Sequence, residues 1–285
     1  MNSERLRIGI PSKGRLSELA TELLKEAGLQ FRRQDRALFA RVRGLDIDLT
    51  FLRTDDIPTL CAEGAIDMGI TGSDLVAEAG AHVEVGLSLG VGHCRLAICV
   101  PEDSPVSSPK DLDGQAVATS FPRLTDQFFS SHGARTHLVK LSGSVEVMIQ
   151  LGVAQAIVDL VETGSTLAAN RLRILDEIGN YETVLIRNNR VRDRATADRL
   201  IRRLEGVVIA RDYSLVEYNI PKERLAEAEQ LTPGFRSPTI STLEDPDWRA
   251  VRVMVRSKEV IDIMERLEEL GASAIIQTAI ANCRL

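Results

Sequence analysis

Short apolar runs alternate with amphipathic segments through the first ninety residues, and this alternation constrains the fold more than any other feature of the sequence. Residues 7–11 form an apolar run, and a Ser-Lys-Gly-Arg turn at 12–15 follows it. Residues 16–27 then place leucine and alanine at the spacing of one helical face, and Gly28 ends them. A strand, turn and helix repeated in this order predict a mostly parallel α/β sheet.

The same order continues along the chain. Pro58 follows an acidic cap in what we expect to be a first helical turn, and Ser73 with Asp74 caps the next helix. We expect strands at 46–52, 66–70, 95–100, 115–119, 137–141, 156–158 and 181–187, and helices at 54–64, 73–80, 125–132, 144–150, 167–172 and 193–204. The last strand and the last helix are expected to return to the first domain.

The pattern changes from about residue 206. Strand-like segments at 207–220, 238–243, 248–255 and 274–283 enclose helical segments at 222–231 and 257–270. The resulting β-α-β-β-α-β order is the ferredoxin-like arrangement. We interpret this part as an appended regulatory domain.

Composition excludes several classes of protein. The net charge of −6 speaks against a nucleic-acid partner, which would need a basic face. No apolar run approaches the ~18 residues of a membrane span, and the first fifteen residues resemble neither a signal nor a transit peptide. The four cysteines lack a CxxC pair, so reduced thiols and a cytoplasmic location are expected.

The run at 156–166 carries the strongest chemical signal. An apolar strand leads to Asp159, and the small hydroxylated turn Thr163, Gly164, Ser165 and Thr166 precedes a helix. Backbone N–H groups of such a turn can hold a phosphate, and a carboxylate beside them suits the hydroxyls of a ribose. The alternative is a plain turn with a capping hydroxyl.

Glu146 lies thirteen residues before Asp159, near the start of the preceding expected helix. It either compensates the helix dipole from the surface or joins Asp159 around one sugar phosphate. In the second case the two carboxylates would hold hydroxyl groups or Mg²⁺.

Several segments together resemble one known family. The run DLVETGSTL at 159–167, with GSVE at 143–146, looks like the phosphoribosyl-pyrophosphate loop of the ATP phosphoribosyltransferases. Further similar segments, in the same order, lie at 11–16, 53–58, 69–74, 118–122 and 233–239. The resemblance covers nearly the whole chain and is to the long form, which carries a C-terminal regulatory domain.

The resemblance implies an α/β fold: a two-lobed, periplasmic-binding-protein-like catalytic part plus a ferredoxin-like (ACT-like) C-terminal domain. Residues 1–93 with 180–205 would form lobe I, 94–179 lobe II with the phosphate loop, and 206–285 the regulatory domain. The implied reaction is the first step of histidine biosynthesis, in which N1 of ATP attacks C1 of phosphoribosyl pyrophosphate. Pyrophosphate leaves with Mg²⁺ present. Homodimers and hexamers that histidine inhibits are implied as well.

The same resemblance assigns roles to residues. Lys13 and Arg15 would neutralise the leaving pyrophosphate, and Glu146 and Asp159 complete the catalytic set. The implied substrate-binding residues are Gly14, Arg53, Asp74, Leu160, Thr163, Gly164, Ser165 and Thr166. Arg53 has the alternative of pairing with a neighbouring aspartate, and Asp74 that of capping a helix. No histidine is assigned a role, because adenine N1 already carries a lone pair.

The effector site is expected at Asn219, Ser273 and Ala274. Some relatives have an aspartate at the position of Asn219, and an amide would bind the ammonium group of histidine less strongly. Phe121 stands where relatives often have a tyrosine. Glu162 is expected to point away from phosphate, which a carboxylate would repel.

Two other functions compete with this one. A ligand-binding module of the periplasmic type would use the same lobes without catalysis. A phosphoribosyltransferase for a different base would use the same phosphate loop, and the turn at 12–15 together with the C-terminal domain favours ATP.

Overall fold

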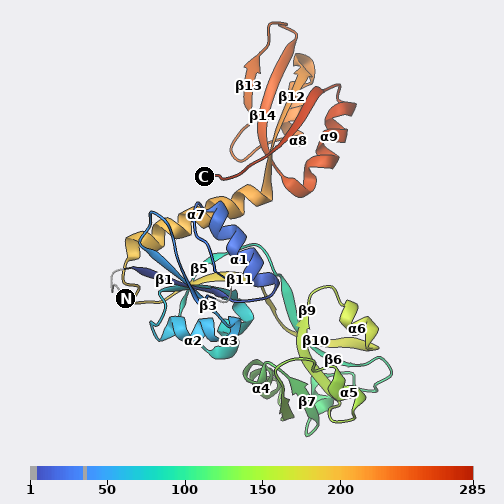
Figure 1. Cartoon of the computed structure of the whole chain (residues 1–285). Helices are drawn as coiled ribbons and strands as arrows, with labels where there is room; N and C mark the ends of the chain where they lie inside the picture. The colour runs from blue at the N-terminus through green and yellow to red at the C-terminus, as the bar shows by residue number, and fades with distance from the viewer. Residues whose placement is uncertain (1–4, 35–36, 285) are drawn as a thin grey trace. The chain divides into compact units, whose positions relative to one another are not determined.

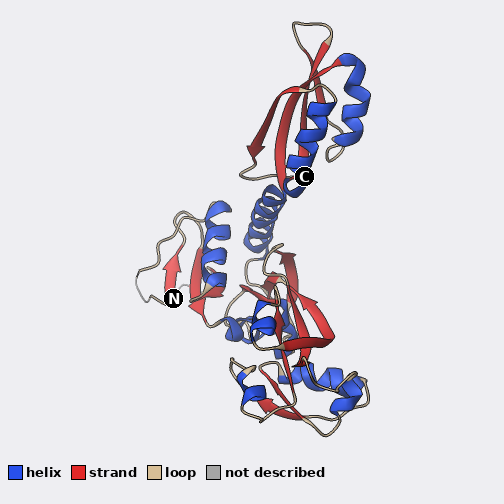
Figure 2. Cartoon of the chain, turned by 90° about the vertical axis from the view of Figure 1, so that its right-hand side faces the viewer, coloured by secondary structure: helices blue, strands red, loops and turns tan. Residues whose placement is uncertain are grey.

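The computed structural model describes residues 5–34 and 37–284, and the strands within these ranges form three sheets (Figure 1, Figure 2). The described residues divide into two compact units. The first comprises the chain up to Thr21 and Gln30–Ala197, and the second comprises Glu22–Leu29 and the chain from Asp198 onward. The domain boundaries expected from the sequence, whose ends at 1–4 and 285 lie outside the described residues, stay a prediction.

The first sheet belongs to the first unit and has the strand order β2-β3-β1-β4-β11-β5. Its strands are β1 (Leu6–Pro11), β2 (Phe39–Arg41), β3 (Ile47–Leu52), β4 (Met68–Gly72), β5 (Glu84–Ser88) and β11 (Thr183–Arg187). The helical segments that lie between its strands along the chain are α1 (Arg15–Glu26), η1 (Thr54–Asp56), α2 (Ile57–Ala62) and α3 (Ser73–Ala79). The part of α1 from Glu22 onward belongs to the second unit.

This sheet is mixed, so the expectation of a mostly parallel sheet is wrong. β1 is parallel to β3 and β4, but β11 is antiparallel to β4 and β5, and β2 is antiparallel to β3. A parallel neighbour needs a crossover of a dozen or more residues, whereas only residues 42–46 join β2 to β3. β11 enters the sheet from β10 of the second sheet, with Glu182 alone between the two strands. The strand expected to return to the first domain does pair in this sheet.

The second sheet of the first unit has the order β10-β6-β9-β7-β8. Its strands are β6 (Cys94–Pro101), β7 (Ala116–Thr119), β8 (His137–Lys140), β9 (Ala156–Val161) and β10 (Leu172–Tyr181). Its helical segments are η2 (Pro109–Leu112), α4 (Pro122–Ser131), α5 (Val147–Gln150) and α6 (Ser165–Ala169).

Apolar side chains fill both faces of this second sheet. On β6, Leu96 and Ile98 belong to one buried cluster, and Ala97 and Cys99 belong to another. Because alternate residues of a strand point to opposite faces, the sheet separates two cores and β6 reads as a continuous apolar run. The four cysteines of the chain are free thiols.

Two helices of the second sheet differ from the expectation. The helix expected at 144–150 begins at Val147, because Ser144 has a φ of 50° and interrupts helical backbone. The helix expected at 167–172 is α6, which ends at Ala169, and Leu172 already begins β10. β10 was missed because polar residues and two register shifts break its alternation.

The second unit contains the ferredoxin-like domain, and the predicted β-α-β-β-α-β order is confirmed. After α7 (Arg194–Asp212) come β12 (Tyr213–Pro221), η3 (Lys222–Arg224), α8 (Leu225–Leu231), β13 (Thr239–Thr242), β14 (Trp248–Arg256), η4 (Ser257–Glu259), α9 (Val260–Glu269) and β15 (Ser273–Ala279). The antiparallel sheet has the order β13-β14-β12-β15. Both α8 and α9 pack on one face of it (Figure 2).

Residues 207–212, expected as strand, are helical and complete α7. Their β-branched side chains favoured a strand, and Gly206 read as a break. Gly206 instead serves packing, since a Cβ there would lie 2.4 Å from the carbonyl oxygen of Cys283. The backbone N–H of Cys283 donates to the carbonyl of Gly206 at 3.0 Å.

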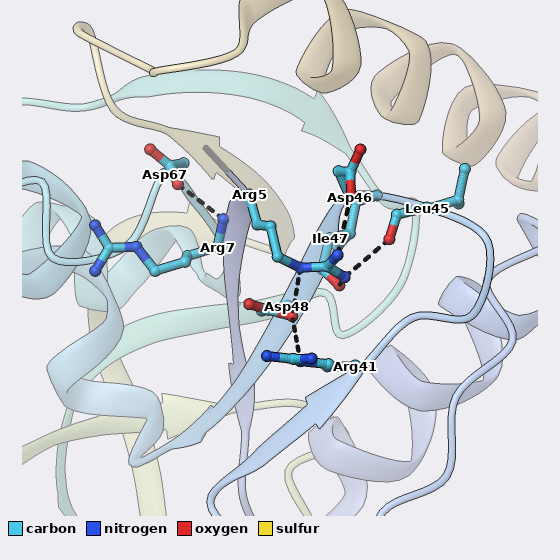
Figure 3. A network of polar contacts seen from close by, with 8 residues as sticks. All are labelled: Arg5, Arg7, Arg41, Leu45, Asp46, Ile47, Asp48 and Asp67. Carbon is cyan, nitrogen blue, oxygen red and sulfur yellow. Dashed lines mark hydrogen bonds and ion pairs between the residues drawn. The ribbon is translucent and has the colours of Figure 1, made fainter. Parts of the chain in front are cut away.

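A polar network holds the amino-terminal part of β1 against β3 and the residue before β4 (Figure 3). The guanidinium of Arg5 donates to the carboxylate of Asp48 at 2.9 Å, and the backbone N–H of Arg7 donates to Asp67 at 2.8 Å. Asp67 is buried and also accepts a hydrogen bond from Arg192 at 3.0 Å. The network fixes one end of β1 and leaves its carboxyl end to the turn at 12–15. Within the described residues, no helix has the length and apolarity needed to cross a membrane.

Candidate active site

Two cavities of the first unit meet at the end of β9. The loop cavity, of about 370 Å³, is lined by Ser144, Glu146, Ile157, Asp159, Leu160, Val161, Glu162, Thr163, Gly164, Ser165, Thr166 and Leu167. The cleft cavity, of about 430 Å³, is lined by Arg15, Leu16, Leu19, Thr54, Gly72, Asp74, Leu75, Val91, Gly92, Cys94, Leu160, Glu162, Glu182 and Thr183. Leu160 and Glu162 line both cavities, so the cavities adjoin.

β9 presents Asp159 at the carboxyl end of a parallel strand pair. β9 and β7 pair in parallel as far as Val158 and Thr119, so Asp159 lies just past the end of that register. The carboxyl ends of strands are where α/β sheets bind ligands. The carboxylate expected from the sequence, Asp159, therefore lies at the edge of the sheet where ligands commonly bind.

The loop after β9 owes its shape to one glycine. Gly164 has a φ of 79°, and a Cβ there would meet no described atom within 4 Å. Backbone conformation rather than crowding therefore requires glycine. Around it, the Thr163 and Ser165 hydroxyls lie 3.1 Å apart, and the N–H of Ser165 donates to the Thr163 hydroxyl at 3.5 Å. The loop thus presents hydroxyl and N–H groups to its cavity.

Asp159 and Glu146 repel each other across the loop cavity. Burial raises the pKa of Asp159, the N–H of Leu160 lowers it by donating to the carboxylate at 2.8 Å, and the nearby Glu146 raises it again. Glu146 precedes α5, and its side chain makes no capping hydrogen bond to a described residue. Two carboxylates in this position call for hydroxyl donors or a cation.

The turn between β1 and α1 exposes two cations. Gly14 has a φ of 80°, and its carbonyl accepts the N–H of Ser17 at 3.0 Å as α1 begins. Lys13 is exposed. Arg15 is also exposed and forms an ion pair with the Glu162 carboxylate. This contact raises the pKa of Arg15 and lowers the pKa of Glu162.

Arg33 supports this turn and was missed by the sequence analysis. Its guanidinium donates to the carbonyl of Ser12 at 2.8 Å and to that of Ala37 at 3.1 Å. It also lies 4.0 Å from the centre of the Phe51 ring, a cation–π distance. A lone arginine in an irregular segment gives no periodic signal, so only the fold reveals this role.

Asp74 lies inside the cleft cavity and is not the helix cap that the sequence indicated. Gly72 occupies the N-cap position of α3, and Asp74 is the second residue of the helix. Burial raises the pKa of its carboxyl group, while the N–H of Leu75 lowers that pKa by hydrogen bonding. A Cβ on Gly72 would lie 2.0 Å from the Asp74 carboxylate, so the pair needs glycine.

Three expected catalytic or substrate-binding residues, Lys13, Gly14 and Arg53, line neither cavity. Arg53 is exposed, lines neither cavity, and makes no ion pair within residues 5–34 and 37–284, which leaves its proposed pairing with an aspartate without support. The histidines likewise line neither cavity.

Cys94 lines the cleft cavity, but burial raises the pKa of its thiol to about 11 and keeps the thiol protonated. Phe121 is buried in a core cluster.

The expected effector residues lie together in the second unit. Asn219 on β12 is opposite Ser273 on β15, next to a register shift. Ala274 has a φ of 50°, which an alanine rarely adopts. The register therefore brings the three residues into one irregular corner of the sheet.

Comparison with known proteins identifies the family. The ATP phosphoribosyltransferase profile matches residues 53–206, and the profile "HisG, C-terminal domain" matches residues 210–282. The chain is 69% identical over 280 residues to the ATP phosphoribosyltransferase of Rhodopirellula baltica, covering 98% of this chain and 94% of that protein. It is 43% identical to the enzyme of Methanopyrus kandleri, covering 95% and 96%.

Solved structures agree with this result. A chain of the ATP phosphoribosyl transferase (HisG:HisZ) complex from Thermotoga maritima is 30% identical, has a TM-score of 0.63, and covers 72% of this chain and 98% of its own length. The predicted α/β fold class is confirmed: the first unit has two sheets with helical segments between their strands, and the second has the ferredoxin-like order. The chain therefore belongs to the ATP phosphoribosyltransferase family and is a transferase.

Proposed function

We propose that this chain transfers the phosphoribosyl group of phosphoribosyl pyrophosphate to N1 of ATP and releases pyrophosphate, the first step of histidine biosynthesis. The observation that carries the proposal is the shared wall of the two cavities, made by Leu160 and Glu162. One cavity is lined by carboxylates and a hydroxylated loop, and the other combines apolar side chains with Arg15 and three carboxylates. A sugar phosphate and an adenine bound side by side match this pair.

The loop cavity would hold the phosphoribosyl group. The turn around Gly164 supplies N–H and hydroxyl donors for the 5′-phosphate, while Asp159 and Glu146 accept hydrogen bonds from ribose hydroxyls. The helix α6 that follows has five residues, so its dipole is small. The recognition we propose therefore rests on the turn itself.

The cleft cavity would hold the adenine of ATP. Leu16, Leu19, Leu75 and Val91 give it apolar walls. The N1 lone pair attacks C1 of the ribose, the C1–O bond to pyrophosphate breaks, and pyrophosphate leaves with the bonding electrons. The work left to the protein is orientation and stabilisation of charge, and Lys13 and Arg15 supply cations for the leaving group.

The residues present fit the Mg²⁺ that we propose as cofactor. Within the described residues no cluster of three or more metal-ligating side chains occurs. Mg²⁺ is commonly bound by one or two carboxylates together with substrate phosphates, and the repelling pair Asp159 and Glu146 meets that need. When bound, the ion would neutralise negative charge on the pyrophosphate group.

The second unit would carry feedback inhibition. We assign Asn219, Ser273 and Ala274 to a histidine site, and we expect homodimers and hexamers of the chain in the cytoplasm, without nucleic-acid or membrane partners. We place lobe I at 1–93 with 180–205, lobe II at 94–179 and the regulatory domain at 206–285.

Near-ultraviolet absorbance of the purified protein tests the proposal. ATP, phosphoribosyl pyrophosphate, Mg²⁺ and pyrophosphatase are mixed with it, with and without histidine. A rise that needs both substrates is expected, and histidine should suppress it. No rise from folded protein beside an active control enzyme would favour a binding module, and a rise with another base in place of ATP would favour a different phosphoribosyltransferase.

A further inference from the structure

The ion pair between Arg15 and Glu162 connects two parts of the site that lie 147 positions apart in the chain. Arg15 is the first residue of α1, and Glu162 is the first residue after β9, immediately before Thr163 of the phosphate loop. Both residues line the cleft cavity, and Glu162 also lines the loop cavity. The pair therefore spans the region where we place the leaving group.

A carboxylate at the start of a phosphate loop is electrostatically unfavourable for an anionic ligand. Glu162 has Arg15 as its ion-pair partner, and no other partner for either residue occurs within the described chain. The Glu162 carboxylate thus pairs with the Arg15 guanidinium, which a phosphate group would otherwise bind. A structural purpose is a poor explanation, because exposed ion pairs add little stability.

The pair is accessible to exchange. The side chains of Arg15 and Glu162 are 77% and 46% exposed, respectively. Pyrophosphate offers several oxygens and a higher charge than a single carboxylate, and a guanidinium binds two oxygens of such a group at once. Pyrophosphate can therefore displace the Glu162 carboxylate from Arg15, and the ion pair can form again when pyrophosphate leaves.

We propose that Glu162 is a positioning residue that holds Arg15 in the empty site and competes with pyrophosphate for it, which weakens retention of this product. The inference rests on the proposed function, since it assumes that pyrophosphate leaves toward Arg15. While the pyrophosphate is still bonded to the ribose, contacts to the sugar and the 5′-phosphate hold the substrate in place. Once the C1–O bond is broken, pyrophosphate loses those contacts and Glu162 regains Arg15.

Calorimetric titration with inorganic pyrophosphate and Mg²⁺ tests the proposal on the full-length protein. Wild type, Glu162→Gln, Arg15→Gln and the double variant are compared. Glu162→Gln should bind pyrophosphate about fivefold more tightly, a ratio that matches the upper range for exposed ion pairs. In the Arg15→Gln background the same change should alter the affinity less than twofold.

A matched control removes an equivalent charge elsewhere. Glu227 forms an exposed ion pair with Arg224 at 2.8 Å in the second unit and lines neither cavity. Glu227→Gln should leave pyrophosphate affinity at the wild-type value. In turnover, Glu162→Gln should show stronger product inhibition, and pyrophosphatase should abolish that difference.

Three outcomes would overturn the proposal in distinguishable ways. Unchanged affinity in Glu162→Gln, with pyrophosphate binding to wild type, would show that Glu162 does not compete. Equal tightening with and without Arg15 would assign the effect to long-range repulsion instead. A wild type that turns over both substrates but binds no pyrophosphate would remove this inference alone, whereas loss of turnover and binding together would remove the proposed function as well.

Discussion

The carboxylate of Glu78, on α3, caps the first turn of α4 by accepting the backbone N–H of Arg123 at 2.9 Å. It also accepts the N–H of Leu124 at 3.0 Å. The N-cap residue of α4, Phe121, has no side-chain acceptor. A glutamate 45 positions before Arg123 therefore supplies what a local serine or aspartate usually does. The guanidinium of Arg123 in turn covers Gly80 at the end of α3. The carboxyl end of α3 and the first turn of α4 are therefore in contact, and the two hydrogen bonds of Glu78 link them.

Replacing Glu78 by glutamine should destabilise the first unit by about 1–2 kcal/mol, the range for loss of a helix cap or a charged hydrogen bond. Urea unfolding measures this change. Asp126→Asn is the control, because it removes a similar charge from an exposed position of the same α4. Equal effects of the two substitutions would show that net charge, and not the cap, is responsible.

Replacing Asp159 by asparagine should weaken the use of phosphoribosyl pyrophosphate. The lost charged hydrogen bonds correspond to about 1–3 kcal/mol in kcat/KM for that substrate. The KM for ATP should change much less, because Asp159 lines the loop cavity and not the cleft cavity. Equal changes for both substrates would contradict the assignment of ribose to this carboxylate.

Replacing Gly164 by alanine should impair activity through the backbone alone. A left-handed φ costs a non-glycine residue roughly 1–2 kcal/mol, and the loop can avoid this strain only by changing the cradle. Gly133→Ala is the matched control, since Gly133 has a φ of 72° and the same open space but lines neither cavity. Both variants should lose similar stability in thermal unfolding, and Gly164→Ala alone should lose activity. Gly164→Pro should abolish it.

Regular elements could be predicted from the sequence because their signals are local. The apolar run of β1, the period of α1 and the β-α-β-β-α-β order of the second unit each depend on neighbouring residues. β2 and β5 were missed because their sequences carry no such local signal. β2 has only three residues, too few for an alternation to be recognised, and β5 lies at the sheet edge and has no buried residue.

The residues of the candidate site also fall into those with a local signal in the sequence and those without one. Asp159 and the turn around Gly164 were predictable, because one strand and one loop carry them together. The contacts of Arg15 with Glu162, of Arg33 with Ser12 and of Glu78 with α4 join residues brought near each other only by the fold. The charge and type of such a side chain indicate that it needs a hydrogen-bond or ion-pair partner, but they do not indicate which residue that partner is.

Replacing Asn219 by aspartate should strengthen inhibition by histidine. A carboxylate at this position would form a charge-assisted hydrogen bond with the ammonium group of the effector, and such bonds are stronger than those of an amide. We expect a decrease of several-fold in the histidine concentration for half inhibition, with basal turnover unchanged. Inhibition by histidine that is the same in Asn219→Asp, Asn219→Ala and wild type would place the effector elsewhere.

Asp74 should show opposite effects on stability and on activity. Burial raises the pKa of its carboxyl group in the folded protein, so the unfolded chain ionises this group more readily and the ionised form opposes folding above that pKa. Asp74→Asn keeps the shape over Gly72 without the charge, and it should raise the free energy of unfolding at pH 7–8. The gain should shrink as the pH falls through the raised pKa, where the wild-type carboxyl also becomes neutral.

Urea unfolding of Asp74→Asn and wild type between pH 4 and 8 measures this trend. In activity assays, the KM of Asp74→Asn for ATP should be higher than that of wild type. A gain in stability that does not depend on pH would show that the charge of Asp74 carries no such penalty.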